Sequence, residues 1–268
     1  MIGSFFQTLF IAPTLNVLLF FYHAFLNFQL PGAFGWAIIA LVSSLRIVLN
    51  PLYHHQVKFQ KKMSDLKPHM DELSKRHKDD KKKLSEAQMS LYKEHGINPA
   101  TGCLVGLLQL PIMFGLYNVL NLFLSNGGLN HLAERVNKLA YIPYLHVTNI
   151  DPIFFGLNLS VSPSAWQKLG WYYLAIPVVT GILQYFQVAM MTPASPPKSK
   201  ETDGKKKSEP GMQEAMNSQM KIMFPLMIGF ASYQFPLGLS LYWNLFSIFT
   251  ILTNYQVNKS HQSLALKS

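Results

Sequence analysis

One arginine stands inside a long apolar segment of the chain. Arg46 follows 45 residues that contain no Lys, Arg, Asp or Glu, and Ile47-Val48-Leu49 comes directly after it. An arginine near the middle of a bilayer costs roughly 2.5–3.5 kcal/mol on insertion scales. The usual compensation is a carboxylate on a neighbouring helix, but the acidic residues of this chain all lie outside its apolar segments. Arg46 must therefore either extend its side chain to the membrane surface or face a hydrated cavity.

Amide and hydroxyl side chains recur in the other apolar segments. Such groups commonly form hydrogen bonds between membrane helices. Together with an unpaired arginine they indicate a positive, acid-free cavity suited to peptide carbonyls, hydroxyls and carboxylates. A cation pump is disfavoured because it would need acids within the membrane. The polar residues concerned are Gln109, Asn118, Asn121, Gln184, Gln187, Ser240, Asn244, Ser247, Thr250 and Asn254.

The composition indicates a membrane protein. Only 13% of the 268 residues are charged, against roughly 25% in an average soluble domain. No charge occurs from Met1 to Leu45 or from Gly96 to Ala133, and about 20 apolar residues are enough to cross a bilayer. These features exclude a soluble enzyme, and no nucleophile–base pair is recognisable. The single cysteine, Cys103, excludes an internal disulfide and a multi-thiolate metal site, so no metal or cofactor is expected.

The expected fold is an all-α polytopic membrane protein with five transmembrane helices around a hydrophilic groove. The last two spans are separated only by a short turn and should form a transmembrane hairpin over residues 220–258. The five segments are Gly32–Tyr53, Leu104–Leu124, Gly170–Met191, Ile222–Pro236 and Leu237–Val257. Spans two and three occupy residues 101–191, with an intervening extracytoplasmic loop over residues 125–169.

The region before the first span, residues 1–31, has one polar face. Asn16, His23 and Asn27 follow one another at spacings of seven and four, which places them on the same side of a helix. We expect an amphipathic helix that lies in the membrane interface, in preference to a sixth span.

The distribution of basic residues predicts the orientation. The loops after spans one, two and three carry eleven, three and six Lys or Arg residues. Loops rich in Lys and Arg stay in the cytoplasm, so the N-terminus is expected outside and the C-terminal tail, residues 259–268, inside. The net charge of +10 is then explained by attraction to anionic lipids, and no specific nucleic acid is expected.

The first cytoplasmic loop, residues 54–100, predicts a helical hairpin. Apolar residues recur at spacings of four and three on either side of a polar break at His77–Asp80, as in a coiled-coil seam. The hairpin either binds a partner or only connects two spans. Its candidate contact residues are Phe59, Met63, Met70, Leu84 and Leu91.

The second cytoplasmic loop, Thr192–Gln219, contains a Pro-rich stretch, three consecutive lysines and Glu-Pro-Gly. This composition predicts disorder. The basic run is a topology signal or a weak contact for acidic lipid or RNA.

Several motifs resemble the YidC/Oxa/Alb family of membrane protein insertases. The resemblance covers nearly the whole chain, and the motifs keep the family's order and spacing. They are Leu45–Leu52, Asn98-Pro99, Gly102-Cys103, Gln109–Ile112, Met223-Phe224-Pro225 and Phe235–Trp243.

The resemblance implies a short bacterial form without the large periplasmic domain, in the plasma membrane. It implies five helices around a groove that is open to cytoplasm and lipid and sealed outside. Nascent membrane proteins are the expected partners, with the ribosome and the Sec translocon as further candidates. Gln184 and Gln187 both remain candidates for the family's groove glutamine. The groove residues are then Arg46, Gln109, Gln184, Gln187, Ser240, Trp243, Asn244 and Ser247. The alternative is a small anion or solute transporter that uses Arg46 as its binding charge.

Overall fold

Helices dominate the described part of the chain, which in this computed structural model comprises residues 5–77, 80–98, 114–115, 117–119, 134–191 and 212–265. Expected span two falls mostly outside these residues. The principal helices are α2 (Ala12–Asn27, preceded by a π-helical turn η1, Gln7–Ile11), α3 (Ala33–Val48), α4 (Asn50–Asp65), α5 (Lys67–Arg76), α6 (Lys81–Glu94), α10 (Ala175–Met191), α11 (Met212–Gln234) and α12 (Leu237–Ala265).

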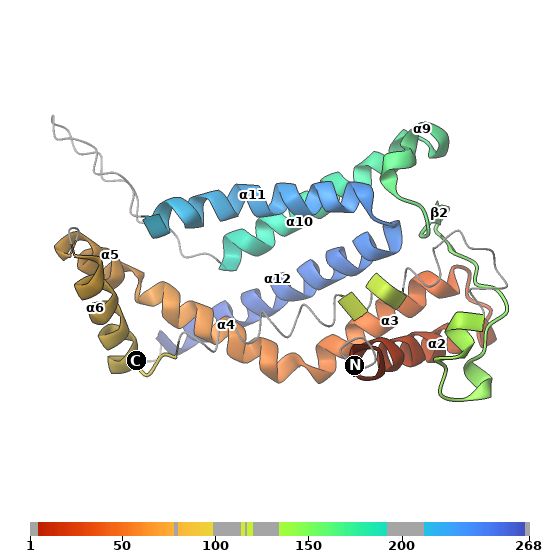
Figure 1. Cartoon of the computed structure of the whole chain (residues 1–268), viewed down its shortest axis with the longest axis horizontal. Helices are drawn as coiled ribbons and strands as arrows, with labels where there is room; N and C mark the ends of the chain where they lie inside the picture. The colour runs from red at the N-terminus through yellow and green to blue at the C-terminus, as the bar shows by residue number, and fades with distance from the viewer. Residues whose placement is uncertain are drawn as a thin grey trace.

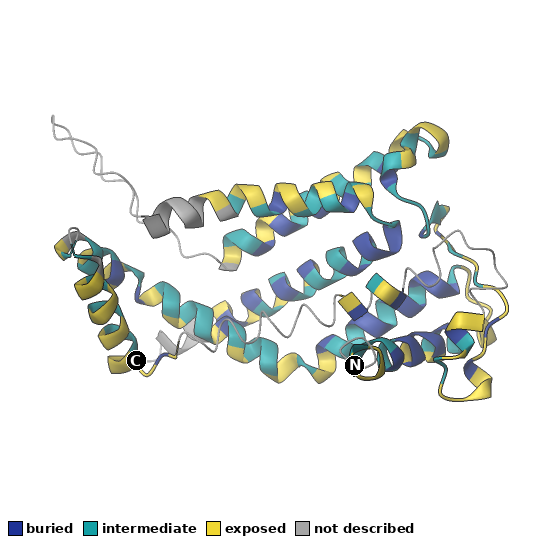
Figure 2. Cartoon of the chain, in the orientation of Figure 1, coloured by how far each residue is buried: buried dark blue, intermediate teal, exposed yellow. Residues whose placement is uncertain are grey.

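Helix α12 connects two helix pairs. It lies between the α10–α11 pair and the α3–α4 layer (Figure 1), and it contacts α3, α4 and α10. Helix α2 packs along α3 through Leu15, Leu18 and Leu19, which are fully buried. Buried positions accordingly concentrate in α2, α3 and α12 (Figure 2). This arrangement allows α12 to link polar groups from both sides.

The first expected span, Gly32–Tyr53, is not one straight helix. α3 ends at Val48, and α4 continues at an angle of 67° after a break of a single residue, Leu49. Pro51 lies in the first turn of α4, where its missing N–H and fixed φ are tolerated. Proline has no N–H for the carbonyl four residues earlier, and its ring clashes with that carbonyl, so the helix bends just before Pro51.

The predicted disorder was wrong for the end of the second cytoplasmic loop. α11 begins at Met212, immediately after the Pro-Gly pair that the sequence analysis assigned to a loop. Residues 212–219 are mostly good helix formers, and a helix that continues into a span has the adjacent packing to stabilise it. Residues 192–211 lie outside the described part.

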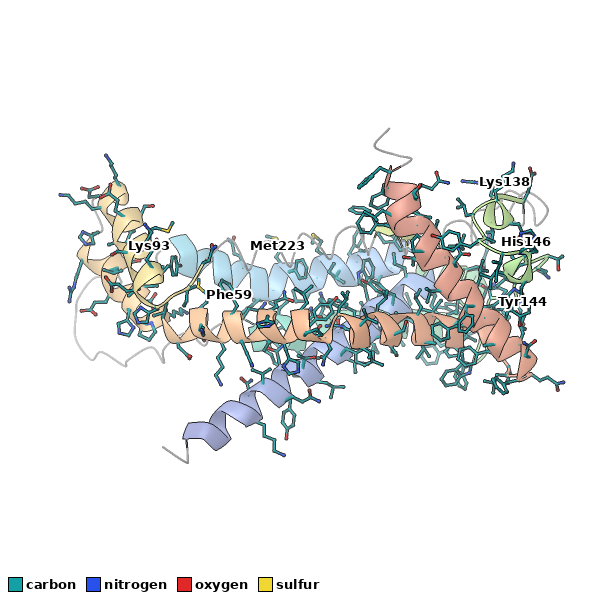
Figure 3. The ribbon with its side chains drawn as sticks, turned by 90° about the horizontal axis from the view of Figure 1, so that it is seen from below. Phe59, Lys93, Lys138, Tyr144, His146 and Met223 are labelled. Atoms are coloured by element: carbon teal, nitrogen blue, oxygen red, sulfur yellow. The ribbon has the colours of Figure 1, made fainter. Side chains whose placement is uncertain are left out.

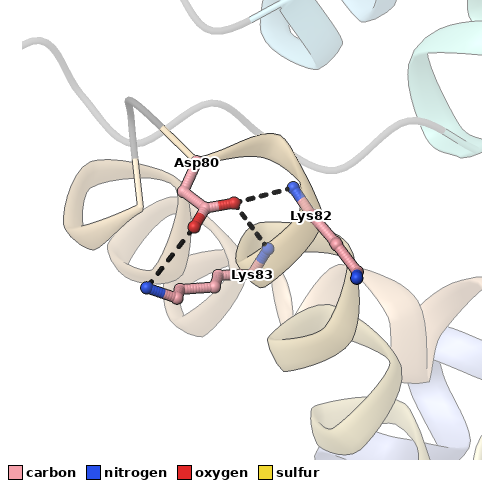
Figure 4. A network of polar contacts seen from close by, with 3 residues as sticks. All are labelled: Asp80, Lys82 and Lys83. Carbon is pink, nitrogen blue, oxygen red and sulfur yellow. Dashed lines mark hydrogen bonds and ion pairs between the residues drawn. The ribbon is translucent and has the colours of Figure 1, made fainter.

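α5 and α6 contact each other beyond the end of α4. Pro68 lies in the first turn of α5 and separates it from α4 at Leu66. Asp80 caps α6, since its carboxylate accepts hydrogen bonds from the backbone N–H groups of Lys82 and Lys83 at 3.1 and 3.0 Å (Figure 4). These bonds, chiefly the one from Lys83, hold the pKa of Asp80 below its ordinary value of 3.8.

A loop between expected spans two and three forms a compact layer at one end of the molecule. Its short elements are η2 (Pro143–Leu145), the antiparallel strands β1 (Ile153–Phe154) and β2 (Leu157–Asn158), η3 (Pro163–Ala165) and α9 (Trp166–Leu169). η4 (Trp171–Leu174) follows at the start of expected span three. Phe155 and Gly156 both have positive φ, as the tightest β-hairpin turns require. Phe154 lies so close to Gly32 and Gly35 that a methyl group at either glycine would overlap its ring.

The polar face of α2 contacts this loop. Asn16 donates to Leu139 O at 2.9 Å and accepts from the N–H of Tyr141 at 2.7 Å. Nearer the end of the helix, Asn27 donates to the hydroxyl of Tyr144 at 3.0 Å. The loop also accepts backbone hydrogen bonds from the α11–α12 turn, from Leu237 and Gly238. It therefore joins the N-terminal helix pair to the C-terminal hairpin.

Two described helices are by themselves long and apolar enough to cross a membrane. They cover Gln7–Asn27 and Trp171–Met190, and the bent pair α3–α4 would be a third if it forms one span. α11 and α12 have 23 and 29 residues, so their length suffices. Polar residues occur in the first turns of α11 and along α12. They lower the mean hydropathy of both helices, so composition alone does not mark these helices as membrane spans.

Candidate functional site

Arg46 lies in the last turn of α3 and is buried, with only 6% of its surface exposed. A cation in this position interacts favourably with the negative end of the helix dipole. Its side chain does not extend to the surface of the described structure. The extended arrangement that the sequence analysis considered is therefore not observed.

The Arg46 guanidinium is held by α4 and α12. Its Nη2 donates to the backbone carbonyl of Phe246 at 2.8 Å and to the hydroxyl of Thr250. Its Cζ lies 3.9 Å from the ring centroid of Tyr53 and 4.0 Å from that of Phe246. Aromatic faces carry negative potential and attract a guanidinium, most strongly when water is excluded. These contacts compensate the buried charge without a carboxylate.

The pocket at Arg46 is small and largely apolar. It has room for about one water molecule. The residues that line it are Val42, Leu45, Arg46, Leu49, Tyr53, Tyr242 and Phe246. Among the described residues, aromatic rings make up most of the surroundings of this arginine, and the hydrated groove stays a prediction.

The polar residues of α12 connect it to α10 and α11. Ser247, on the same turn of α12 that holds Arg46, donates to Gln184 Oε1 on α10 at 2.8 Å. Nearer the loop layer, Ser232 Oγ lies 2.8 Å from Ser240 Oγ and 3.2 Å from Thr180 Oγ1. These side chains are buried. Arg46 and Gln184 thus contact adjacent sides of the same turn of α12, around Ser247.

The other predicted groove residues are less closely grouped. Gln187 is buried on α10, one turn from Gln184. Trp243 is partly buried and packs against Phe235, with ring centroids 6.1 Å apart. The side-chain oxygen of Asn244 is buried and accepts no hydrogen bond from the described residues. Gln109 lies outside the described residues.

The candidate partner-contact residues of the hairpin are only partly accessible. Met70 is buried, while the other four are intermediate, and none of the five is among the exposed apolar side chains. The five are Phe59, Met63, Met70, Leu84 and Leu91. Their partial burial is typical of a seam within the hairpin, and partner binding at these positions stays a prediction.

Sequence reasoning missed the two aromatic residues at Arg46. Tyr53 lies seven residues further along, a spacing that would indicate a shared face in a continuous helix. The bend at Leu49 breaks that continuity, and Phe246 comes from the other end of the chain. No pattern in the sequence alone indicates that these two rings meet at Arg46.

Comparison with known proteins identifies the family. The family described as "60Kd inner membrane protein" matches residues 25–264, which are 240 of the 268 residues. The chain belongs to this family, the YidC/Oxa/Alb family of membrane protein insertases. The resemblance seen in the motifs is confirmed, and the family and the apolar helices make the chain a plasma-membrane protein.

The chain spans little more than a third of the length of the curated relatives that it matches. A membrane protein insertase YidC from Pelagibacter ubique (strain HTCC1062) is 30% identical over 237 residues, which cover 87% of this chain and 37% of the relative. Another, from Campylobacter jejuni subsp. jejuni, is 29% identical over 238 residues, covering 88% and 36%. A crystal structure of an active YidC insertase, with its first transmembrane domain resolved, is 25% identical with a TM-score of 0.48, covering 83% of this chain and 41% of that one.

Proposed function

We propose that this chain is a membrane protein insertase and chaperone, not an enzyme, which moves nascent membrane proteins from the cytoplasm into the plasma membrane. The observation that carries the proposal is Arg46, a buried cation with no carboxylate partner among the described residues, in a chain of the insertase family. Such a charge is suited to hold the acidic or polar flank of an arriving polypeptide for a short time. None of the named relatives is a transporter, so the alternative of a solute carrier has no support.

The proposed topology has five spans, with the N-terminus outside and the C-terminus in the cytoplasm. The loop that carries Tyr144 and His146 lies at one end of the molecule, and the hairpin that carries Lys93 lies at the other (Figure 3). The two basic loops would face the cytoplasm, where the hairpin can meet anionic lipids. Nascent chains are the proposed substrates, and the ribosome and the Sec translocon are candidate partners.

We place α2 in the outer interface rather than across the membrane. Its contacts with the loop extend from Asn16 to Asn27, about 16 Å along a helix. If α2 crossed the bilayer, the loop beside it would carry polar backbone groups deep into hydrocarbon, where each unsatisfied group costs several kcal/mol. An interfacial α2 under the loop avoids that cost and would help to seal the outer side.

The proposed groove runs along the faces of α3, α10 and α12 that carry Arg46, Gln184 and Ser247. A polar flank would enter it from the cytoplasmic side, while the apolar segment of the substrate meets lipid along α10 and α11. Those helices expose large apolar side chains, including Ile182, Met223 and Phe230. Transfer of the segment into lipid supplies the driving force, at roughly 0.8 kcal/mol for each methylene buried.

The test is insertion of a single-span reporter with an acidic outer tail into proteoliposomes. The proteoliposomes contain the wild-type chain, Arg46→Ala or Arg46→Lys. We expect protease-protected tail with the wild type, near-background levels with Arg46→Ala, and partial recovery with Arg46→Lys, which keeps the charge but loses the planar donor geometry. A wild-type chain that inserts no more than empty liposomes would refute the proposed function.

A further inference from the structure

The surroundings of Arg46 restrict where an acceptor can approach it. The guanidinium is planar, with five N–H groups around its edge. Two rings lie against it, Tyr53 from α4 and Phe246 from α12. Nη2 is already engaged by Phe246 O and Thr250, whereas Nε is buried and meets no acceptor among the described residues. Both N–H groups of Nη2 are therefore used within the protein, and an acceptor from another chain would have to bind the remaining N–H groups.

The two rings also determine where the charge resides. Arg46 is in the last turn of α3, directly before the bend at Leu49, and a long side chain there could extend to the cytoplasmic surface. The rings of Tyr53 and Phe246 also pack on each other edge to face, with centroids 6.1 Å apart. They thus enclose the guanidinium from two helices that are distant in sequence. Without the rings, the buried position loses its main compensation for the lost water.

We propose that Tyr53 and Phe246 are positioning residues for Arg46, an aromatic clamp that holds the guanidinium inside the helix bundle, where its remaining N–H groups can bind a carboxylate of the arriving chain. This inference rests on the proposed insertase function. It attributes the insertase's preference for substrates with acidic tails to the clamp. A carboxylate accepts charge-assisted hydrogen bonds from a guanidinium, and these are stronger than the bonds that a neutral amide accepts.

The experiment compares two reporters that differ only in one tail residue, Asp or Asn, in proteoliposomes. The measured quantity is the ratio of their insertion yields. We expect Tyr53→Leu and Phe246→Leu each to lower this ratio roughly tenfold, since a desolvated cation–π contact is strong enough to produce such a change. Tyr53→Phe and Phe246→Tyr keep a ring and should keep the ratio. Tyr255→Leu removes an exposed ring from α12 and serves as the matched control.

A second measurement separates the clamp from a general packing role. Phenylalanine with one, two or three ring fluorines at position 246 preserves the shape of the side chain while weakening the negative potential of its face. The Asp/Asn ratio should fall stepwise along this series. A packing role would leave the ratio unchanged by fluorination.

The possible outcomes distinguish the two proposals. If the wild type inserts neither reporter, the insertase function itself fails. If it inserts the Asp reporter preferentially but the fluorine series and both leucine variants keep that preference, the clamp is refuted while the function stands. If a leucine variant does not fold, the fluorine series, which does not alter packing, still decides.

Discussion

Replacing Thr250 with valine should destabilise the protein by removing one acceptor of the buried arginine. The Thr250 hydroxyl accepts from Arg46 and donates to Phe246 O within its own helix. Hydrogen bonds between membrane helices average about 0.6 kcal/mol, but those to charged groups contribute about 1.5–3 kcal/mol. Since Arg46 keeps its bond to Phe246 O, we expect Thr250→Val to lower the free energy of unfolding by about 1.5–2 kcal/mol.

Thr253→Val is the matched control on the same helix. Thr253 donates to Phe249 O, the same bond within the helix that Thr250 makes, but no described contact joins it to Arg46. Subtracting the two variants therefore leaves only the contribution of the arginine contact. The assay is reversible unfolding of the purified chain in mixed detergent micelles. Equal destabilisation by the two substitutions would refute the assignment of Thr250 as a partner of Arg46.

Three further predictions test other parts of the molecule. Asn16→Ala should greatly accelerate hydrogen exchange of the Tyr141 amide, because it removes the acceptor of that N–H, whereas Asn27→Ala, at an exposed contact, should leave it unchanged. Gly229→Ala should be tolerated, while Gly229→Leu should separate α11 from α10, because a Cβ there already lies 3.4 Å from a backbone oxygen of α10; chemical crosslinking between these helices measures the difference. Acidification should remove the cap that Asp80 provides for α6. The pKa of this carboxylate is lowered in the folded chain, so it stabilises the helix above pH 3.8 and loses this effect as the pH falls through its folded pKa. Amide exchange at the start of α6 should then approach that of Asp80→Ala, and equal exchange in the wild type and the variant at neutral pH would contradict this prediction.

Local patterns in the sequence were informative about what each segment is. The absence of charge before Leu45 indicated a membrane protein, and the motifs around Arg46 and Trp243 indicated the family that the comparison confirmed. Proline had a clear local effect at Pro51 and Pro68, where helices restart. Composition misjudged residues 212–219, because they form the start of α11, a helix whose later turns continue into an apolar segment.

The partners of the polar residues could not be predicted from the sequence. Its periodicity placed Asn16 and Asn27 on one face of a helix, but did not reveal that residues 139–144 cover that face. It likewise marked Arg46 as a charge that needs compensation without showing what supplies it.

Only the tertiary structure decided that compensation. It brings Tyr53, after the bend, and Phe246, 200 residues away from Arg46 in sequence, into contact with one guanidinium. The physical reason is that hydropathy and helical periodicity depend on residues close in sequence, whereas burial of a charge depends on atoms within a few ångströms in space. The sequence determined that the chain belongs in a membrane and that an arginine in one of its apolar segments needs compensation. The packing of α3, α4 and α12 determined that this cation is buried and how it is held.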